Sequence, residues 1–201
     1  MDLKIATILI LKFSFSFLVQ ATFDIYFKSL KCGKPDPTYA KVERCQIKAE
    51  RGKKGVFYIN ITHPQPVTKD RNIWIHGRIF YKTSTGALYP YMVDAKAEVC
   101  EIYKFFDSTN PLMKMIVKVG MKAGTREFVN QVRKGCPIKG PIVADGFDPN
   151  AVKDYLPPIV PEGIFKIVLR AYEPRTNHTM MDGHMYVELK SHGISDRIKI
   201  G

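Results

Sequence analysis

The residues of this 201-residue chain that are best suited to chemistry are its four cysteines. Cys32 and Cys45 enclose twelve residues, and Cys100 and Cys136 follow farther along the chain. No pair has the Cys-x-x-Cys spacing of a thioredoxin-type redox site or a zinc knuckle. In an oxidising compartment the four would form two disulfides, with three possible pairings. We favour Cys32–Cys45 with Cys100–Cys136, each contributing about 3 to 4 kcal/mol of stability.

Patterns typical of catalytic or metal sites are sparse. The sequence has no Gly-x-Ser-x-Gly elbow, no His-Glu-x-x-His motif, no P-loop and no Gly-x-Gly-x-x-Gly turn. The stretch from His178 to Met185 combines imidazole and thioether groups that suit copper, but a hairpin with His and Met beside its turn is the preferred interpretation. We therefore expect no metal, no cofactor and no enzyme activity, and a secreted hydrolase is the least favoured alternative.

The N-terminal segment predicts where the protein resides. Lys4 precedes an apolar run from Ile5 to Val19. The run is short for a bilayer span and is interrupted by a lysine, which argues against a permanent membrane anchor. Val19-Gln20-Ala21 places small or modest residues where a signal peptidase would cut, so a cleaved secretory signal is preferred to an uncleaved anchor or a buried first helix. We predict a signal peptide over residues 1–21 and one domain over residues 22–201, secreted into the extracellular space.

Glycosylation sequons agree with secretion, and the net charge describes the surface. Asn60 (in Asn-Ile-Thr) and Asn177 (in Asn-His-Thr) begin glycosylation sequons. The formal net charge of +12 would suit nucleic acid, glycosaminoglycan or anionic lipid headgroups. Because the basic residues are scattered, a solvated positive surface is the preferred interpretation, and no nucleic-acid partner is expected.

Alternation of apolar and polar residues with a period of two predicts a mainly β protein. The alternating segments span residues 44–49, 57–61, 72–82, 91–99, 165–171 and 184–190. Asp182-Gly183 would form the turn of the last hairpin, and Thr85-Gly86 would form that of another. Short antiparallel strands with one apolar face pack as a β-sandwich.

One segment has helical periodicity instead. Asn110 and Pro111 suit a helix start, and Gly124 suits its end. Between them, apolar residues recur at helical spacing: Leu112, Met115, Ile116 and Val119. We predict a single amphipathic helix inserted between the third and fourth cysteines.

The apolar inventory includes twelve Phe, ten Tyr and eight Met. Such side chains can fill a solid core or line an adaptable apolar cavity. Composition leaves both interpretations open.

A family resemblance is carried by five segments that follow one another along the chain in this order: DPTYAKVERCQIKAE, ALYPYMVDAKAEVCEIYKF, NPLMKMIVKVG, CPIKGPI and LPPIVPEGIFKIVLRAY. Over roughly residues 25–192 the chain resembles the insect secreted DUF1091 (DM8-type) family, which includes CheB-like chemosensory proteins. That family looks distantly similar to the ML lipid-recognition proteins, such as the ganglioside activator and the Niemann–Pick cholesterol carrier. The resemblance implies an immunoglobulin-like antiparallel β-sandwich with a lipid pocket between its sheets, and it supports a Cys100–Cys136 bridge. Gly135 departs from the family pattern, since many relatives carry His there.

A candidate pocket follows from these expectations. Its lining would comprise Phe57, Ile59, Ile75, Ile79, Tyr91, Val93, Phe165, Ile167 and Leu169, although each could equally be ordinary core. Met115, Ile116 and Val119 of the helix would form a lid, with Lys114 and Lys118 near an acidic headgroup.

The function predicted from these features is that of a secreted, monomeric glycoprotein that binds a lipid or other hydrophobic small molecule, in chemosensory or extracellular lipid handling. The alternative is a dry-cored interaction module that assists a membrane receptor or channel.

Overall fold

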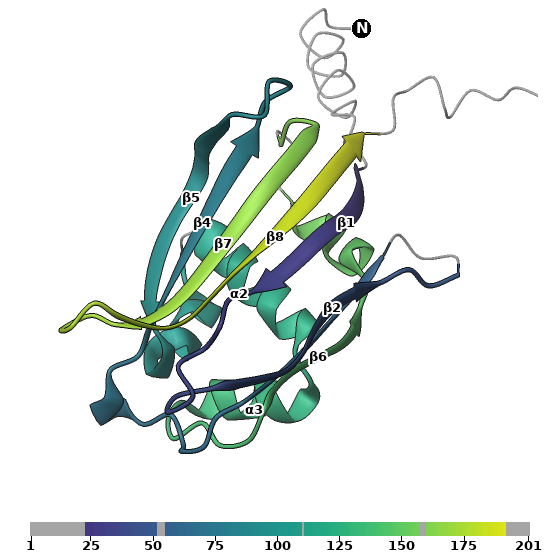
Figure 1. The fold of residues 1–201 in the computed structure, drawn as a ribbon. Coiled ribbons are helices and arrows are strands. Elements are labelled where there is room, and N and C mark those ends of the chain that lie inside the picture. The colour runs from purple at the N-terminus through teal and green to yellow at the C-terminus, as the bar shows by residue number, and fades with distance from the viewer. Residues whose placement is uncertain (1–22, 52–54, 110, 157–159, 192–201) are drawn as a thin grey trace, which may run out of the picture.

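The structure is a computed structural model that describes residues 23–51, 55–109, 111–156 and 160–191 (Figure 1). The predicted signal peptide lies outside the described residues. Within them the chain is mainly β. The eight strands are β1 (Phe23–Cys32), β2 (Lys41–Lys48), β3 (Val56–Thr62), β4 (Trp74–Lys82), β5 (Leu88–Glu98), β6 (Ile142–Phe147), β7 (Gly163–Glu173) and β8 (His178–Ser191).

Helices occupy the connections between strands. Among the described residues, the α-helices are α2 (Pro111–Ala123) and α3 (Arg126–Lys134). Three short 3₁₀ helices are η1 (Lys69–Arg71), η2 (Val99–Asp107) and η3 (Pro149–Tyr155).

The strands form two antiparallel sheets. The larger sheet has the order β1-β8-β7-β4-β5, and the smaller has the order β2-β3-β6. In Figure 1 the larger sheet turns its outer face to the viewer, and α2 lies behind it. The predicted arrangement of two antiparallel sheets with few helices is therefore confirmed.

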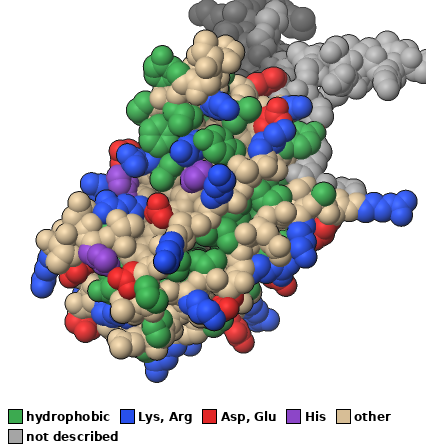
Figure 2. Space-filling model, viewed as in Figure 1, with side chains coloured by type: hydrophobic (Ala, Val, Ile, Leu, Met, Phe, Trp, Pro, Cys, Tyr) green, Lys and Arg blue, Asp and Glu red, His purple; other side chains and the backbone are tan. Residues whose placement is uncertain are grey.

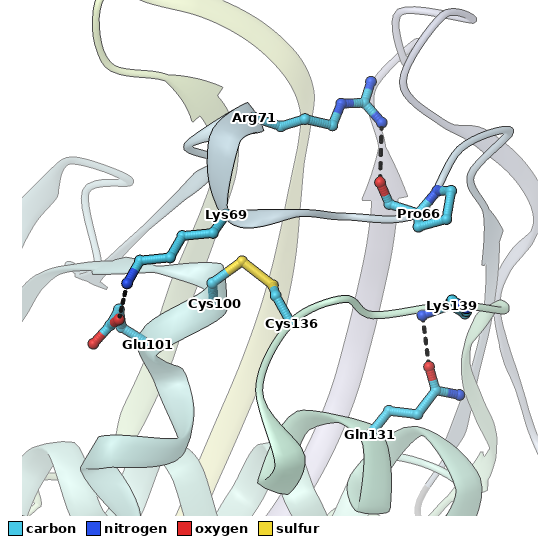
Figure 3. The surroundings of a disulfide bond; sticks show 8 residues. All are labelled: Pro66, Lys69, Arg71, Cys100, Glu101, Gln131, Cys136 and Lys139. Atoms are coloured by element: carbon cyan, nitrogen blue, oxygen red, sulfur yellow. Dashed lines mark hydrogen bonds and ion pairs between the residues drawn. A yellow bond between two sulfur atoms is a disulfide. The ribbon is translucent and has the colours of Figure 1, made fainter.

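Both predicted disulfides are present. Cys32–Cys45 joins the end of β1 in the larger sheet to β2 in the smaller one. Cys100–Cys136 joins η2 to the segment that follows α3, with 5.1 Å between the Cα atoms (Figure 3).

The second bridge is reinforced on both sides. Lys69 Nζ lies 3.6 Å from Glu101 Oε1, next to Cys100. Beyond Cys136, the Lys139 amide donates to Gln131 Oε1 at 2.6 Å (Figure 3). The ion pair thus joins η1 to η2, and the hydrogen bond joins α3 to the segment that follows Cys136.

The prediction of a turn at Asp182-Gly183 is wrong. Both residues lie inside β8, where Gly183 pairs with Leu169 of β7. The turn falls at residues 174–177, and Asn177 adopts φ 55° there. A Cβ at Gly183 would lie 3.1 Å from the Lys31 carbonyl oxygen, so this glycine allows β1 to approach β8 closely. The turn at Thr85-Gly86 is confirmed, with Gly86 at φ 89°.

The prediction of a single inserted helix is incomplete. α2 forms where predicted, but α3 follows it almost directly. Thr125 caps α3 by accepting a hydrogen bond from the Phe128 amide through its side chain. Strands β1 and β6 are also additional to the predicted segments.

Candidate functional site between the two sheets

Strand register places an aromatic group on the inner face of the larger sheet. Phe165 of β7 pairs with Tyr81 of β4 on one side and with Val187 of β8 on the other. The Phe165 ring centroid lies 5.4 Å from that of Tyr81 and 5.1 Å from that of Tyr91, both in edge-to-face geometry. Such contacts fix the ring orientations beyond what apolar burial alone would do.

A second aromatic group connects the two sheets. The ring centroids of Phe57 (β3) and Phe147 (β6) lie 4.9 Å apart. Phe27 of β1 lies 5.1 Å from Phe57 and 6.3 Å from Phe147. Because Phe27 belongs to the larger sheet, the contacts among these three rings pack the two sheets against each other at one end.

One continuous core contains both groups. Phe57 and Phe165 are buried members of it, and Ile59, Ile79, Tyr91, Val119 and Ile167 pack against it. The structure thus brings together seven of the predicted lining and lid residues. α2 contributes Val119, so the helix faces the same interior as the two sheets.

The remaining candidates lie elsewhere or differ in exposure. Val93 is buried, and Ile75 and Ile116 are half-buried, but none of these three belongs to this core cluster. Lys114 and Lys118 are exposed, and Lys118 Nζ lies 5.5 Å from the Tyr155 ring centroid. The Met115 side chain is outside the described part of the structure.

Other interior residues were not among the predicted lining. They are Phe23, Ile25, Ala144, Phe147, Val152, Val187 and Leu189. The alternation of Phe23, Ile25 and Phe27 with polar neighbours is a strand signal that the sequence contained. Ala144 has no comparable signal, because it sits in the short β6 strand beside a glycine-containing stretch.

The interior is apolar. Among the described residues, no polar or charged residue is classed as buried. Burial raises the pKa of the Tyr91 hydroxyl, which keeps this group neutral. No group of three or more His, Cys, Asp or Glu side chains in the described segments could hold a metal ion.

The interior keeps a little accessible surface. In the described part of the chain, the largest side chains that are fully buried are only Val56 and Pro149. The nine buried residues of the core cluster each remain between 4% and 9% exposed, although they face inward.

Leu169 marks a place where the inner face is open. No register shift separates it from Phe165 and Ile167 in the pairing with β4, so alternation puts all three on the same face. Phe165 is 4% exposed, whereas Leu169 is 53% exposed. Its cross-strand partners are both glycines, Gly77 and Gly183. Because glycine has no side chain, neither partner covers Leu169.

Part of the chain matches a family model. Residues 75–167 match the family described as protein of unknown function, DUF1091. The DUF1091 component of the resemblance is confirmed over this segment. It runs from β4 into β7 and includes both α-helices and the Cys100–Cys136 bridge. An insect origin and a relation to CheB-like proteins stay predictions.

Among solved structures, the crystal structure of chicken MD-1 complexed with lipid IVa is similar to this chain, at 8% sequence identity and a TM-score of 0.28. The match covers 83% of this chain and 97% of that one. No curated protein matches the chain, and no helix in the described segments has the length and apolar character to cross a membrane.

Proposed function

We propose that this protein binds a lipid or other hydrophobic small molecule in the interior between its two sheets. The observation that carries the proposal is the residual exposure of the inward-facing apolar side chains. Apolar, inward-facing space between the sheets would exchange water for an acyl chain favourably. Each methylene buried contributes about 0.8 kcal/mol, so a long chain supplies ample affinity without any catalytic group.

In this proposal, the ligand enters the interior beside Leu169. An acyl chain entering there would pass from an exposed leucine to the half-buried Ile167 and then to the buried Phe165, along one face of β7. α2 would act as the lid through Ile116 and Val119. Lys114 and Lys118 are exposed on that helix and would attract an acidic headgroup.

Uptake of a fluorescent long-chain fatty acid by delipidated protein tests the proposal. We expect saturable binding, and we expect Leu169→Ala to weaken it about fivefold, because about 1 kcal/mol of apolar contact is lost. Val168→Ala is the matched control, since Val168 neighbours Leu169 on the same strand but points to the opposite face. Absence of saturable uptake would favour the alternative, a dry-cored accessory module for a receptor or channel.

The proposed setting is extracellular lipid handling or chemosensation by a secreted monomer. Two disulfides agree with an oxidising compartment.

The two sequons should differ in use during secretion from eukaryotic cells. Asn177 lies exposed in the β7–β8 turn, where Arg170 donates to its side-chain oxygen at 3.1 Å and to Thr179 Oγ1 at 2.7 Å. Attachment uses the amide nitrogen, which these bonds leave available. Asn60 lies in the central strand of the smaller sheet, and its side-chain oxygen is buried.

We therefore expect Asn177→Gln to remove a glycan-sized mass and Asn60→Gln to leave the mass distribution of the secreted protein unchanged. Intact-mass spectrometry before and after glycosidase treatment makes this comparison. A glycan that persists in Asn177→Gln and disappears in Asn60→Gln would contradict the assignment.

A further inference from the structure

The end of the β4–β5 hairpin carries apolar side chains that are exposed and lie outside the core. We call residues 82–92 the hairpin tip. Leu88, Tyr89 and Met92 within it are 39%, 59% and 61% exposed. They are three of the six large hydrophobic side chains exposed in the described residues, so the exposure is concentrated in one short segment. Concentrated apolar exposure marks an interaction surface rather than ordinary scatter.

The backbone of the hairpin tip is unsuited to strand addition. Among the described strands, β5 lies at the sheet edge and pairs with β4 alone. Pro90 has no N–H to offer, and Met92 has a φ of 44° at a register shift in the pairing with β4. A proline and a bulge on an edge strand prevent another strand from pairing there. A partner at this site would therefore contact side chains and would not extend the sheet.

Cations accompany Leu88 on the outer face, whereas Tyr89 pairs with Tyr81 and lies on the other face. Lys82 pairs with Leu88, and Lys166 of β7 pairs with Phe80 beside the tip. Both lysine Nζ atoms lie near the Tyr186 ring centroid, at 5.9 Å and 5.8 Å. Figure 2 shows this face, with hydrophobic side chains gathered toward its upper end and Lys and Arg side chains among them.

The nearby carboxylate does not cancel this charge. Asp94 pairs with Arg78 across the strands, and its side chain also bonds His76 Nε2 at 2.6 Å. The pKa of His184 on the same face is lowered by burial and by the positive charges of Lys166 and Lys31. The outer face beside the hairpin tip therefore carries Lys82 and Lys166 next to the Tyr186 ring.

We propose that the hairpin tip docks this protein on the surface of an anionic lipid bilayer. Leu88 and Met92 would enter the boundary between headgroups and acyl chains, and Tyr89 would occupy the headgroup level that tyrosine favours. Lys82 and Lys166 would then contact lipid phosphates and carboxylates. Apolar side chains flanked by lysines, on an edge that cannot pair with a strand, match such a surface. The proposal stands whether or not lipid enters the interior.

Flotation with vesicles of phosphatidylcholine and phosphatidylserine tests the docking. The full secreted chain should bind these vesicles, bind pure phosphatidylcholine vesicles far more weakly, and dissociate as salt is raised. Leu88→Ala combined with Met92→Ala should weaken the partition coefficient about tenfold. Lys82→Ala should weaken it about fivefold.

Two control variants make the test specific. Tyr103→Ala removes a side chain that is 38% exposed on η2, and Lys153→Ala removes an exposed charge on η3; both should bind vesicles normally. Sedimentation velocity of the unmodified chain and of the Leu88→Ala/Met92→Ala variant completes the set. The proposal is overturned if anionic vesicles are not bound or if the controls lose binding equally. It is also overturned if the unmodified chain forms a dimer that the tip variant abolishes, because the tip would then bind a second copy.

Discussion

Replacing Cys100 and Cys136 together with alanine is expected to lower the free energy of unfolding by about 4 kcal/mol. The bridge closes a loop across a sequence separation of 36 residues, which the reduced chain would explore freely when unfolded. This loop holds η2, α2 and α3, so its release also frees the helices that cover the interior. Alanine is preferred to serine because Cys100 is buried and a hydroxyl there would need a partner.

Urea denaturation followed by circular dichroism measures this effect. The matched control is Cys32→Ala with Cys45→Ala, which opens a loop with a separation of only 13 residues and should cost about 3 kcal/mol. The first variant should therefore unfold at the lower urea concentration. An unfolding midpoint for Cys100→Ala/Cys136→Ala equal to that of the unmodified protein would mean that the bridge contributes nothing in solution.

Replacing Ala144 with leucine is expected to weaken fatty-acid binding about 50-fold while the protein stays folded. Ala144 belongs to the core cluster on β6, where it pairs with Ile59. Leucine adds about three carbons, which would occupy the space of about three ligand methylenes at about 0.8 kcal/mol each. If the interior has room for a ligand next to Ala144, the added carbons fill that room with little strain.

The stability of the same variant separates a partly empty interior from a solid one. Overpacking a solid core costs typically about 1 to 3 kcal/mol. We expect the free energy of unfolding of delipidated Ala144→Leu to fall by less than about 1 kcal/mol. Val143→Leu is a suitable control, because Val143 neighbours Ala144 on the opposite face of β6. Strong destabilisation of Ala144→Leu with unchanged fatty-acid binding would indicate a solid core.

Much of this fold could be predicted from local patterns. The alternation around Ile59, Ile79 and Ile167 identified strands because a half-buried strand repeats every two residues. α2 was predicted from its helical spacing and from proline at its first position. The Cys100–Cys136 pairing also followed the order of motifs shared with the resembling family.

Other features depend on contacts between distant segments. Asp182-Gly183 has the composition of a tight turn, but the close approach of β1 requires glycine there and keeps both residues within β8. The exposure of Leu169 could not be inferred from β7, which alternates regularly through it. It depends on glycines in two neighbouring strands.

Native mass spectrometry of the purified chain most directly tests whether the interior binds lipid. Unmodified protein incubated with a long-chain fatty acid is predicted to carry one molecule per chain. Under the same conditions Ala144→Leu should appear mainly without ligand. Equal retention by both proteins, or none by either, would contradict the proposal that a hydrophobic molecule occupies the space between the sheets.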